Sequence, residues 1–208
     1  MKALICSLAV VPLMASGATI VESHVFSVST VIPDNSAIGV SDSRVSVSDI
    51  ESITSVELTL VTSGGWNGDL YVYLLHGSGF SVLLNRAGRT LLNPDGAASS
   101  GMVLTFSDSA SGDVHAGIAA SGVASGTFQP DGRETDPANA LDTDSRTALL
   151  SSFGGLNADG EWTLFVADAA TGEIATFESW TLTLTGVPEP SSALLAGLGC
   201  LMAFRRRR

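Results

Sequence analysis

The sequence has two cysteines, Cys6 and Cys200, and its central part, residues 19–186, has neither a cysteine nor a lysine. The central part therefore forms no disulfide, and it offers no thiolate as a nucleophile or a metal ligand. It keeps five arginines against 20 carboxylates, so its net charge is about −15, more acidic than the −11 of the whole chain. Nucleic acids and anionic lipids bind basic surfaces, so this composition excludes both as partners.

The acidity leaves three classes of ligand for the central part: divalent cations, basic polymers and neutral glycans. A simpler interpretation is that the negative charge only keeps the protein soluble. The length of about 168 residues fits one domain, and it is enough to build a core without disulfides.

Long apolar runs are scarce and occur only at the two ends of the chain. At the N-terminus, Lys2 precedes an apolar run over residues 3–14, and Ser16-Gly17-Ala18 follows with small side chains. This order predicts a secretory signal peptide over residues 1–18. Cleavage is expected after Ala18, and cleavage after Ala15 is an alternative.

The C-terminal 22 residues, 187–208, contain a proline-rich break, an apolar stretch and a basic end. Pro188-Glu189-Pro190 precedes the apolar residues 191–204, which are short for a membrane span: as a helix they would cover roughly 21 Å of a hydrocarbon core of about 30 Å. Such a short segment is typical of a signal that is read and then cleaved. Four consecutive arginines end the chain and are expected to stay on the cytoplasmic side of a membrane as a basic stop signal. They are Arg205, Arg206, Arg207 and Arg208.

These three parts, in this order, resemble the PEP-CTERM sorting signal of Gram-negative bacteria. The resemblance implies export across the inner membrane, transient insertion of the C-terminal helix, and cleavage by an exosortase, a membrane transpeptidase. It also implies a final location at the cell surface or in the extracellular matrix, with exopolysaccharide or other surface proteins as partners. The alternative is an ordinary membrane anchor in which Pro188, Glu189 and Pro190 occur together by chance.

Apolar side chains in the central part recur at every second position, and no stretch shows a convincing helical period. This alternation is typical of strands with one buried face, and the frequent turns between them predict an all-β sandwich. Tyr71 and Tyr73 are expected on the face opposite to the core. Two similar strands, around Trp162 and Trp180, are expected to be neighbours. The predicted core positions are Val45 and Val47; Val56, Leu58 and Leu60; Leu70, Val72 and Leu74; Met102, Leu104 and Phe106; Trp162, Leu164 and Val166; and Trp180, Leu182 and Leu184.

The domain at residues 19–186 also resembles the P domain (P/Homo B) of subtilisin-like proprotein convertases. The resemblance implies a jelly-roll β-sandwich. In that family the domain sits beside a subtilisin-type catalytic domain and stabilises it, but this sequence contains no such catalytic segment. Residues 85–155 match less closely and are expected to contain long loops. The stretches that carry the resemblance are Ile32-Pro33-Asp34, Ile38-Gly39-Val40, Trp66 to Leu74, Ser81 to Arg86, Gly160 to Asp168, and Ser179 to Leu184.

We expect no catalytic site in this sequence. A Ser-His-Asp triad requires a histidine base. Of the three histidines, His24 is expected to fray after the signal peptide, His76 to lie in a hairpin turn, and His115 to lie in a polar loop. No serine occupies a Gly-x-Ser-x-Gly elbow, and the histidines are too scattered for a zinc site.

Calcium is the one cofactor that the sequence favours, because it binds carboxylate and carbonyl oxygens in loops. The candidate ligands are Asp108, Asp113 and Asp131, which lie in loops rich in aspartate and glycine. Asp69 and Asp168 are further candidates, although carboxylates at strand ends more often accept backbone N–H groups.

The tryptophans have two interpretations. Trp162 and Trp180 are in phase with the core positions of their strands. Trp66 follows two glycines and is a candidate platform for a sugar ring, although burial is favoured for it as well.

We therefore predict an exported, non-catalytic protein with a structural or adhesive role at the cell surface or in the matrix. One alternative is a glycan- or calcium-dependent binding module. Another is an accessory domain of a subtilisin-like endopeptidase that acts with a separate catalytic chain.

Overall fold

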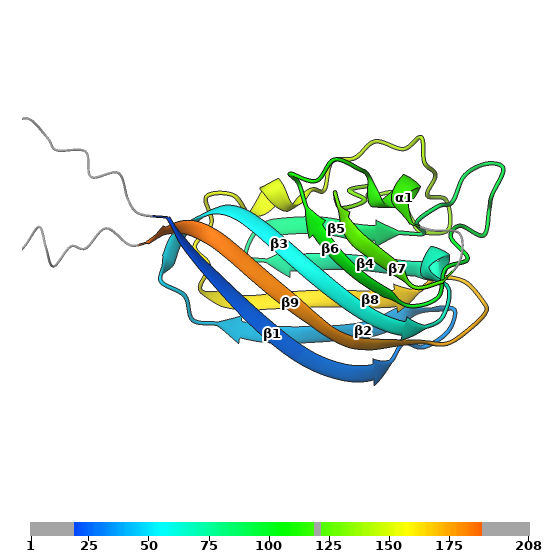
Figure 1. Cartoon of the computed structure of the whole chain (residues 1–208), viewed down its shortest axis with the longest axis horizontal. Coiled ribbons are helices and arrows are strands. Elements are labelled where there is room, and N and C mark those ends of the chain that lie inside the picture. Colours follow the sequence, from blue (N-terminus) through cyan, green and yellow to red (C-terminus); the bar gives the residue numbers. More distant parts are fainter. Residues whose placement is uncertain (1–18, 119–121, 189–208) are drawn as a thin grey trace, which may run out of the picture.

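Two β-sheets pack face to face in the computed structural model, which describes residues 19–118 and 122–188 (Figure 1). No helix in the described part is long and apolar enough to cross a membrane.

The two terminal signals fall almost entirely beyond these residues. Pro188, the first residue of the sorting motif, is the last residue of a strand. The predicted signal peptide over residues 1–18 lies outside the described residues, and so do the rest of the sorting motif and the whole basic stop signal. The structure therefore does not test the predictions for these parts, which rest on the sequence. The residues concerned at the C-terminus are Glu189, Pro190, Arg205, Arg206, Arg207 and Arg208.

One sheet has five strands and the other has four. One sheet contains, in spatial order, β1 (Ile20–Val31), β9 (Ala175–Pro188), β3 (Ile50–Gly64), β6 (Met102–Ser107) and β7 (Ala124–Phe128). The other contains β2 (Ser36–Ser46), β8 (Gly160–Asp168), β4 (Leu70–His76) and β5 (Gly79–Asn85). Neighbouring strands run antiparallel, except that β6 and β7 are parallel.

The order β1-β9-β3-β6 facing β2-β8-β4-β5 is that of a jelly roll, with β7 added at one edge. The predicted jelly-roll β-sandwich is therefore confirmed. The expectation that the strands of Trp162 and Trp180 are neighbours is wrong, because β8 and β9 belong to different sheets. The two strands have similar sequences because each places alternate side chains into the same core.

The core lies between the sheets and contains the alternating apolar residues of both. Trp162 and Trp180 are fully buried, as predicted, together with Leu58, Leu164 and Leu182. The indole of Trp180 donates to Asp42 Oδ2 at 2.7 Å, which satisfies its buried N–H group. The sequence pattern therefore locates most of the core, but it is wrong for Val45 and Val47, which are 74% and 86% exposed.

The N-terminal strand corrects one expectation. His24 lies within β1, opposite Leu182 of β9, and is not part of a frayed end. The long strands β1, β9 and β3 run side by side across one face of the molecule (Figure 1).

The segment between β5 and β8 is mostly loop, as expected for residues 85–155. Besides β6 and β7, its described part contains only the short α1 (Val114–Gly117) and the 3₁₀ helix η2 (Leu150–Phe153). A third helical turn, η1 (Asn67–Asp69), precedes β4.

Candidate functional site

A buried cluster of charged side chains holds the long loops together. Asp131 is fully buried and receives a hydrogen bond at each carboxylate oxygen, from His115 Nδ1 at 2.8 Å and from Arg133 Nη1 at 3.1 Å. Arg133 also donates to Asp113 Oδ2 at 3.0 Å. Arg146 approaches the same Asp113 oxygen at 3.7 Å. We call these five residues the loop ion cluster.

Each charge in the loop ion cluster has a partner of opposite sign. Burial disfavours the charged form of Arg133, but hydrogen bonds and the charges of Asp113 and Asp131 outweigh this and raise its pKa. Asp113 also caps α1 by accepting the backbone N–H of His115 at 3.0 Å. The cluster therefore anchors the loop segments around residues 113, 131 and 146 to one another.

Two of the predicted calcium ligands, Asp113 and Asp131, thus both accept hydrogen bonds from Arg133. Asp108 uses its carboxylate differently, since it accepts the backbone N–H groups of Leu150 and Ser151 at the start of η2. Within residues 19–118 and 122–188, no three His, Cys, Asp or Glu side chains converge to hold a metal ion. Calcium binding by Asp108, Asp113 and Asp131 stays a prediction.

His115 makes the stability of the loop ion cluster depend on pH. Burial alone would lower its pKa, but hydrogen bonds to Asp131 and to the Arg89 carbonyl outweigh this and raise the pKa above its ordinary value of 6.5. The folded state therefore binds the proton more tightly than the unfolded state. This contribution is fully present below pH 6.5 and is lost as the pH rises through the folded-state pKa.

We expect His115→Gln to lower the free energy of unfolding by about 1.5–3 kcal/mol at pH 5.5, since it removes a buried, charge-assisted hydrogen bond. The difference between wild type and variant should shrink at pH 9. Urea denaturation of both proteins at pH 5.5, 7 and 9 measures it. A difference that does not change with pH would contradict a charged His115.

His76 is also engaged by the fold. His76 is the last residue of β4 and is buried against the Trp162 ring, with 4.0 Å between ring centroids. Its ring nitrogens lie 2.9 and 2.8 Å from the carbonyl oxygens of Glu161 and Asn157. The expectation that His115 lies in a polar loop is incorrect. His115 belongs to α1, and its side chain is buried.

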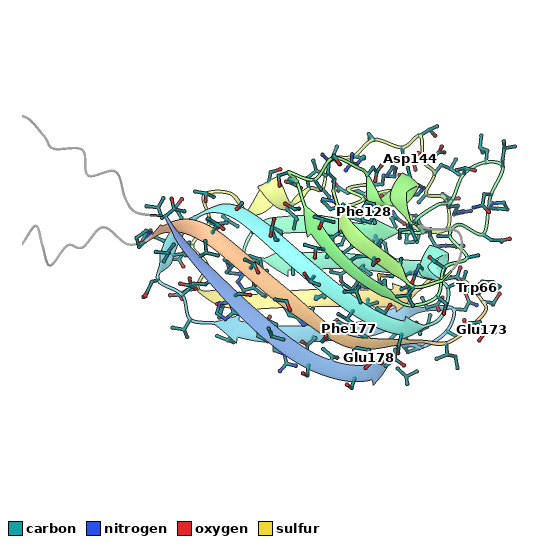
Figure 2. All side chains as sticks on the ribbon, in the orientation of Figure 1. Trp66, Phe128, Asp144, Glu173, Phe177 and Glu178 are labelled. Carbon is teal, nitrogen blue, oxygen red and sulfur yellow. The ribbon has the colours of Figure 1, made fainter. Side chains whose placement is uncertain are left out.

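Trp66 precedes η1 and does not lie in the core. Its side chain is 41% exposed, so the favoured burial is wrong and the alternative of an exposed ring is the correct one. Figure 2 shows Trp66 and Glu173 at the same end of the sandwich. The ring lies against Gly172 in the connection between β8 and β9.

Two carboxylates lie near Trp66, at the end of the sandwich where β4 begins and β8 ends. Asp168 accepts the backbone N–H of Ala170 at 3.2 Å, as expected for a strand-end aspartate. Burial raises the pKa of Asp69 to about 6, and the charge of Asp168 adds to this while Arg86 opposes it. Burial likewise raises the pKa of Asp168.

An aromatic surface that the sequence alone did not indicate lies on the outer face of the four-stranded sheet. Tyr71 and Tyr73 of β4, Phe165 of β8 and Phe80 of β5 form a partly exposed row there. Tyr73 stacks on Phe165 with 4.6 Å between ring centroids, and it lies 5.8 Å from Tyr71 and 5.6 Å from Phe80. An outer sheet face is usually polar, so four adjacent rings are unusual at this position.

Three rings of this row, those of Tyr71, Tyr73 and Phe165, form one wall of a cavity of about 510 Å³, which we call the aromatic pocket. The loop at 136–138 and the turn at 35–37 form its rim. Burial raises the pKa of Tyr71, and the nearby Tyr73, Glu134 and Asp136 raise it further, so the rim is acidic. The lining residues are Asn35, Ser36, Ala37, Tyr71, Tyr73, Asp136, Pro137, Ala138, Phe165, Ala167 and Ala169.

Comparison with known families agrees with this fold. The family model of the proprotein convertase P-domain matches residues 53–184, so the chain belongs to the P-domain family. The PEP-CTERM protein-sorting motif matches residues 186–208, which include the basic stop signal at residues 205, 206, 207 and 208. The chain is therefore an exported protein that is anchored in the membrane during sorting and processed by an exosortase.

Two solved structures are similar to the chain at low sequence identity. Crystal structures of the Aeromonas sobria serine protease, alone and in complex with its chaperone, share 14% identity with the chain at TM-scores of 0.48 and 0.47. The matches cover 84% and 82% of this chain but only 28% and 27% of those chains. The chain thus spans about a quarter of the length of these structures. No curated protein matches it.

Proposed function

We propose that this protein is a non-catalytic adhesive domain that binds a glycan in the aromatic pocket at the cell surface or in the extracellular polysaccharide. The observation that carries the proposal is the row of stacked aromatic rings on the outer sheet face. The sorting motif supports it, because an exported domain is exposed to extracellular polysaccharide.

The chemistry of the aromatic pocket suits a sugar ring. The apolar C–H face of a sugar packs against flat aromatic faces, while its hydroxyl groups need polar partners at the edges. Tyr71 and Tyr73 supply both, since each combines a ring with a hydroxyl group. The volume of about 510 Å³ lies within the usual range of ligand pockets.

The charge of the rim indicates which sugars fit. Asp136 lines the pocket and Glu134 lies near Tyr71. Carboxylates accept hydrogen bonds from sugar hydroxyl or amino groups, but they repel the carboxylates of uronic acids. We therefore propose that neutral or amino sugars bind and that polyuronates do not.

We expect Tyr73→Ala to weaken binding of a neutral polysaccharide at least about tenfold, which corresponds to about 1.4 kcal/mol. Tyr73 is the central ring of the row and contacts three other rings, so its loss breaks the platform. Titration calorimetry with polysaccharide isolated from the native cells, a neutral glucan and a polyuronate measures the effect.

Trp66→Ala is the matched control, because Trp66 is an exposed aromatic residue outside the pocket. It should leave binding unchanged. Loss of glycan binding in Trp66→Ala, with full binding in Tyr73→Ala, would show that the glycan site is at Trp66. Absence of binding to all three polysaccharides would contradict the glycan proposal.

The absence of catalysis is part of the proposal. In the part of the chain that the structure describes, the hydrogen bonds of His76 and His115 go to carbonyl groups and a carboxylate rather than to a serine hydroxyl. This arrangement supports a non-catalytic role. Hydrolysis of peptide substrates by the purified chain would overturn it.

Membership of the P-domain family favours a second candidate, an accessory role for a separate subtilisin-like endopeptidase. A stable complex with such an enzyme, formed in the presence of excess polysaccharide, would favour this role over glycan binding.

A further inference from the structure

Asp69 and Asp168 form a buried carboxylate pair. The two residues are only 2% and 0% exposed. The register of the four-stranded sheet places Leu70 opposite Asp168, and the N–H of Ala169 donates to the Asp69 carbonyl at 2.8 Å. Asp69, the last residue of η1, and Asp168, the last residue of β8, are therefore diagonal neighbours.

Each aspartate of the pair has one bonded oxygen and one free oxygen. Asp69 Oδ1 lies 3.5 Å from Arg86 Nη2, and Asp168 Oδ1 accepts the N–H of Ala170. The Oδ2 atoms of both are buried and have no hydrogen-bond partner among the described residues. A buried carboxylate oxygen without a donor is strongly unfavourable, so a proton, a water molecule or a cation at each free oxygen would stabilise the pair.

The local charge is also unbalanced. Arg86 is itself buried, and its Nε donates to the Gly68 carbonyl at 2.6 Å while Nη2 only approaches Asp69. One guanidinium thus faces two buried carboxylates. Asp34 adds a third negative charge nearby, with its Oδ1 accepting the N–H of Gly172 at 3.0 Å.

The free oxygen of Asp69 points towards the connection between β8 and β9. A Cβ atom at Gly172 would lie 3.4 Å from Asp69 Oδ2 and 3.4 Å from the Trp66 ring. Gly172 therefore lies close to both Asp69 and the Trp66 ring, and Figure 2 shows Glu173 at the same end of the sandwich as Trp66. Main-chain carbonyl groups are available there as additional oxygen ligands.

We propose that the free oxygens of Asp69 and Asp168 bind a Ca²⁺ ion, with carbonyl oxygens of residues 169–173 and water completing its coordination. Calcium accepts such mixed oxygen ligands in flexible numbers. Because no three acidic or histidine side chains converge in the described residues, we expect a weak site, with a dissociation constant of about 10⁻⁴–10⁻³ M, as in extracellular modules. The site is separate from Asp108, Asp113 and Asp131, and it does not depend on glycan binding.

Calorimetric titration of the metal-stripped, signal-cleaved protein with CaCl₂ tests the site. Wild type should bind one Ca²⁺ ion and melt at a higher temperature in 10 mM CaCl₂ than in chelator. Asp69→Asn and Asp168→Asn should each weaken binding at least tenfold and lose the rise in melting temperature. Asp49→Asn, at an exposed aspartate, is the matched control and should behave as wild type.

Terbium luminescence gives a readout that does not depend on how the aspartate variants fold. Trp66 lies close enough to the site to sensitise Tb³⁺, so wild type should emit on tryptophan excitation and CaCl₂ should quench the signal. Trp66→Phe should lose most of the emission and still bind Ca²⁺ by calorimetry.

Three results would overturn the proposal: no Ca²⁺ binding by wild type up to 10 mM, full binding in both aspartate variants, or loss of binding in Asp49→Asn. Each of these leaves glycan binding by the aromatic pocket intact, so the two proposals fail separately.

Discussion

Replacing Arg133 with leucine is expected to lower the free energy of unfolding by about 3–5 kcal/mol, because it leaves buried carboxylates without their counter-charge. Arg133 is 4% exposed and donates to both Asp131 and Asp113. Its Nη2 also donates to the carbonyl of Asp142 at 2.8 Å. The substitution therefore removes the central cation of the loop ion cluster and one loop contact.

Arg44→Leu is the matched control for this substitution. Arg44 pairs with Asp42 at 2.8 Å, but its side chain is 38% exposed, and ion pairs in water contribute only about 0–1 kcal/mol. Urea denaturation followed by circular dichroism measures both variants at pH 7. Equal losses of stability in the two variants would show that the loop ion cluster is not a structural anchor.

The core strands could be predicted because each follows the alternation that a sandwich imposes. Leu70, Val72 and Leu74 alternate with Tyr71 and Tyr73, and the structure places these two sets on opposite faces of β4. The pattern needs only local sequence, so it identifies the strands without any knowledge of their partners.

Strand β1 could not be predicted, because apolar residues lie on both of its faces, and only one face, with Ile20, Phe26 and Val28, packs against the core. Val21 and Val25 are 65% and 73% exposed, while Glu22 and His24 lie on the more buried side. An edge strand is held by backbone pairing, here with β9, and can carry polar side chains towards the sheet. The alternation of apolar and polar residues in β1 therefore does not indicate the core side.

The candidate sites depend on contacts between distant parts of the chain. The sequence places Asp113 and Asp131 in acidic loops, but it does not show that Arg133 lies between them. It also predicts that Tyr71 and Tyr73 face outwards, but not that the loop at 136–138 turns this face into a pocket. Local patterns specify which face a side chain occupies, and only the folded chain specifies its partner.

Replacing Trp162 with alanine is expected to lower the free energy of unfolding by about 3–5 kcal/mol, the usual loss for a buried tryptophan. Trp162 is fully buried, stacks on His76 and lies 5.2 Å from the Phe153 ring.

The same Trp162 substitution also removes the indole N–H that donates to the Ala158 carbonyl at 3.1 Å. Trp162→Phe restores most of the apolar volume but not this donor, so we expect it to lose less stability than Trp162→Ala. Trp66→Ala, at an exposed position, should change stability by less than about 1 kcal/mol. Guanidinium denaturation of the three variants measures these differences. A loss of stability in Trp66→Ala as large as that in Trp162→Ala would contradict this prediction. It would mean that burial does not set the contribution of these indoles to the free energy of unfolding.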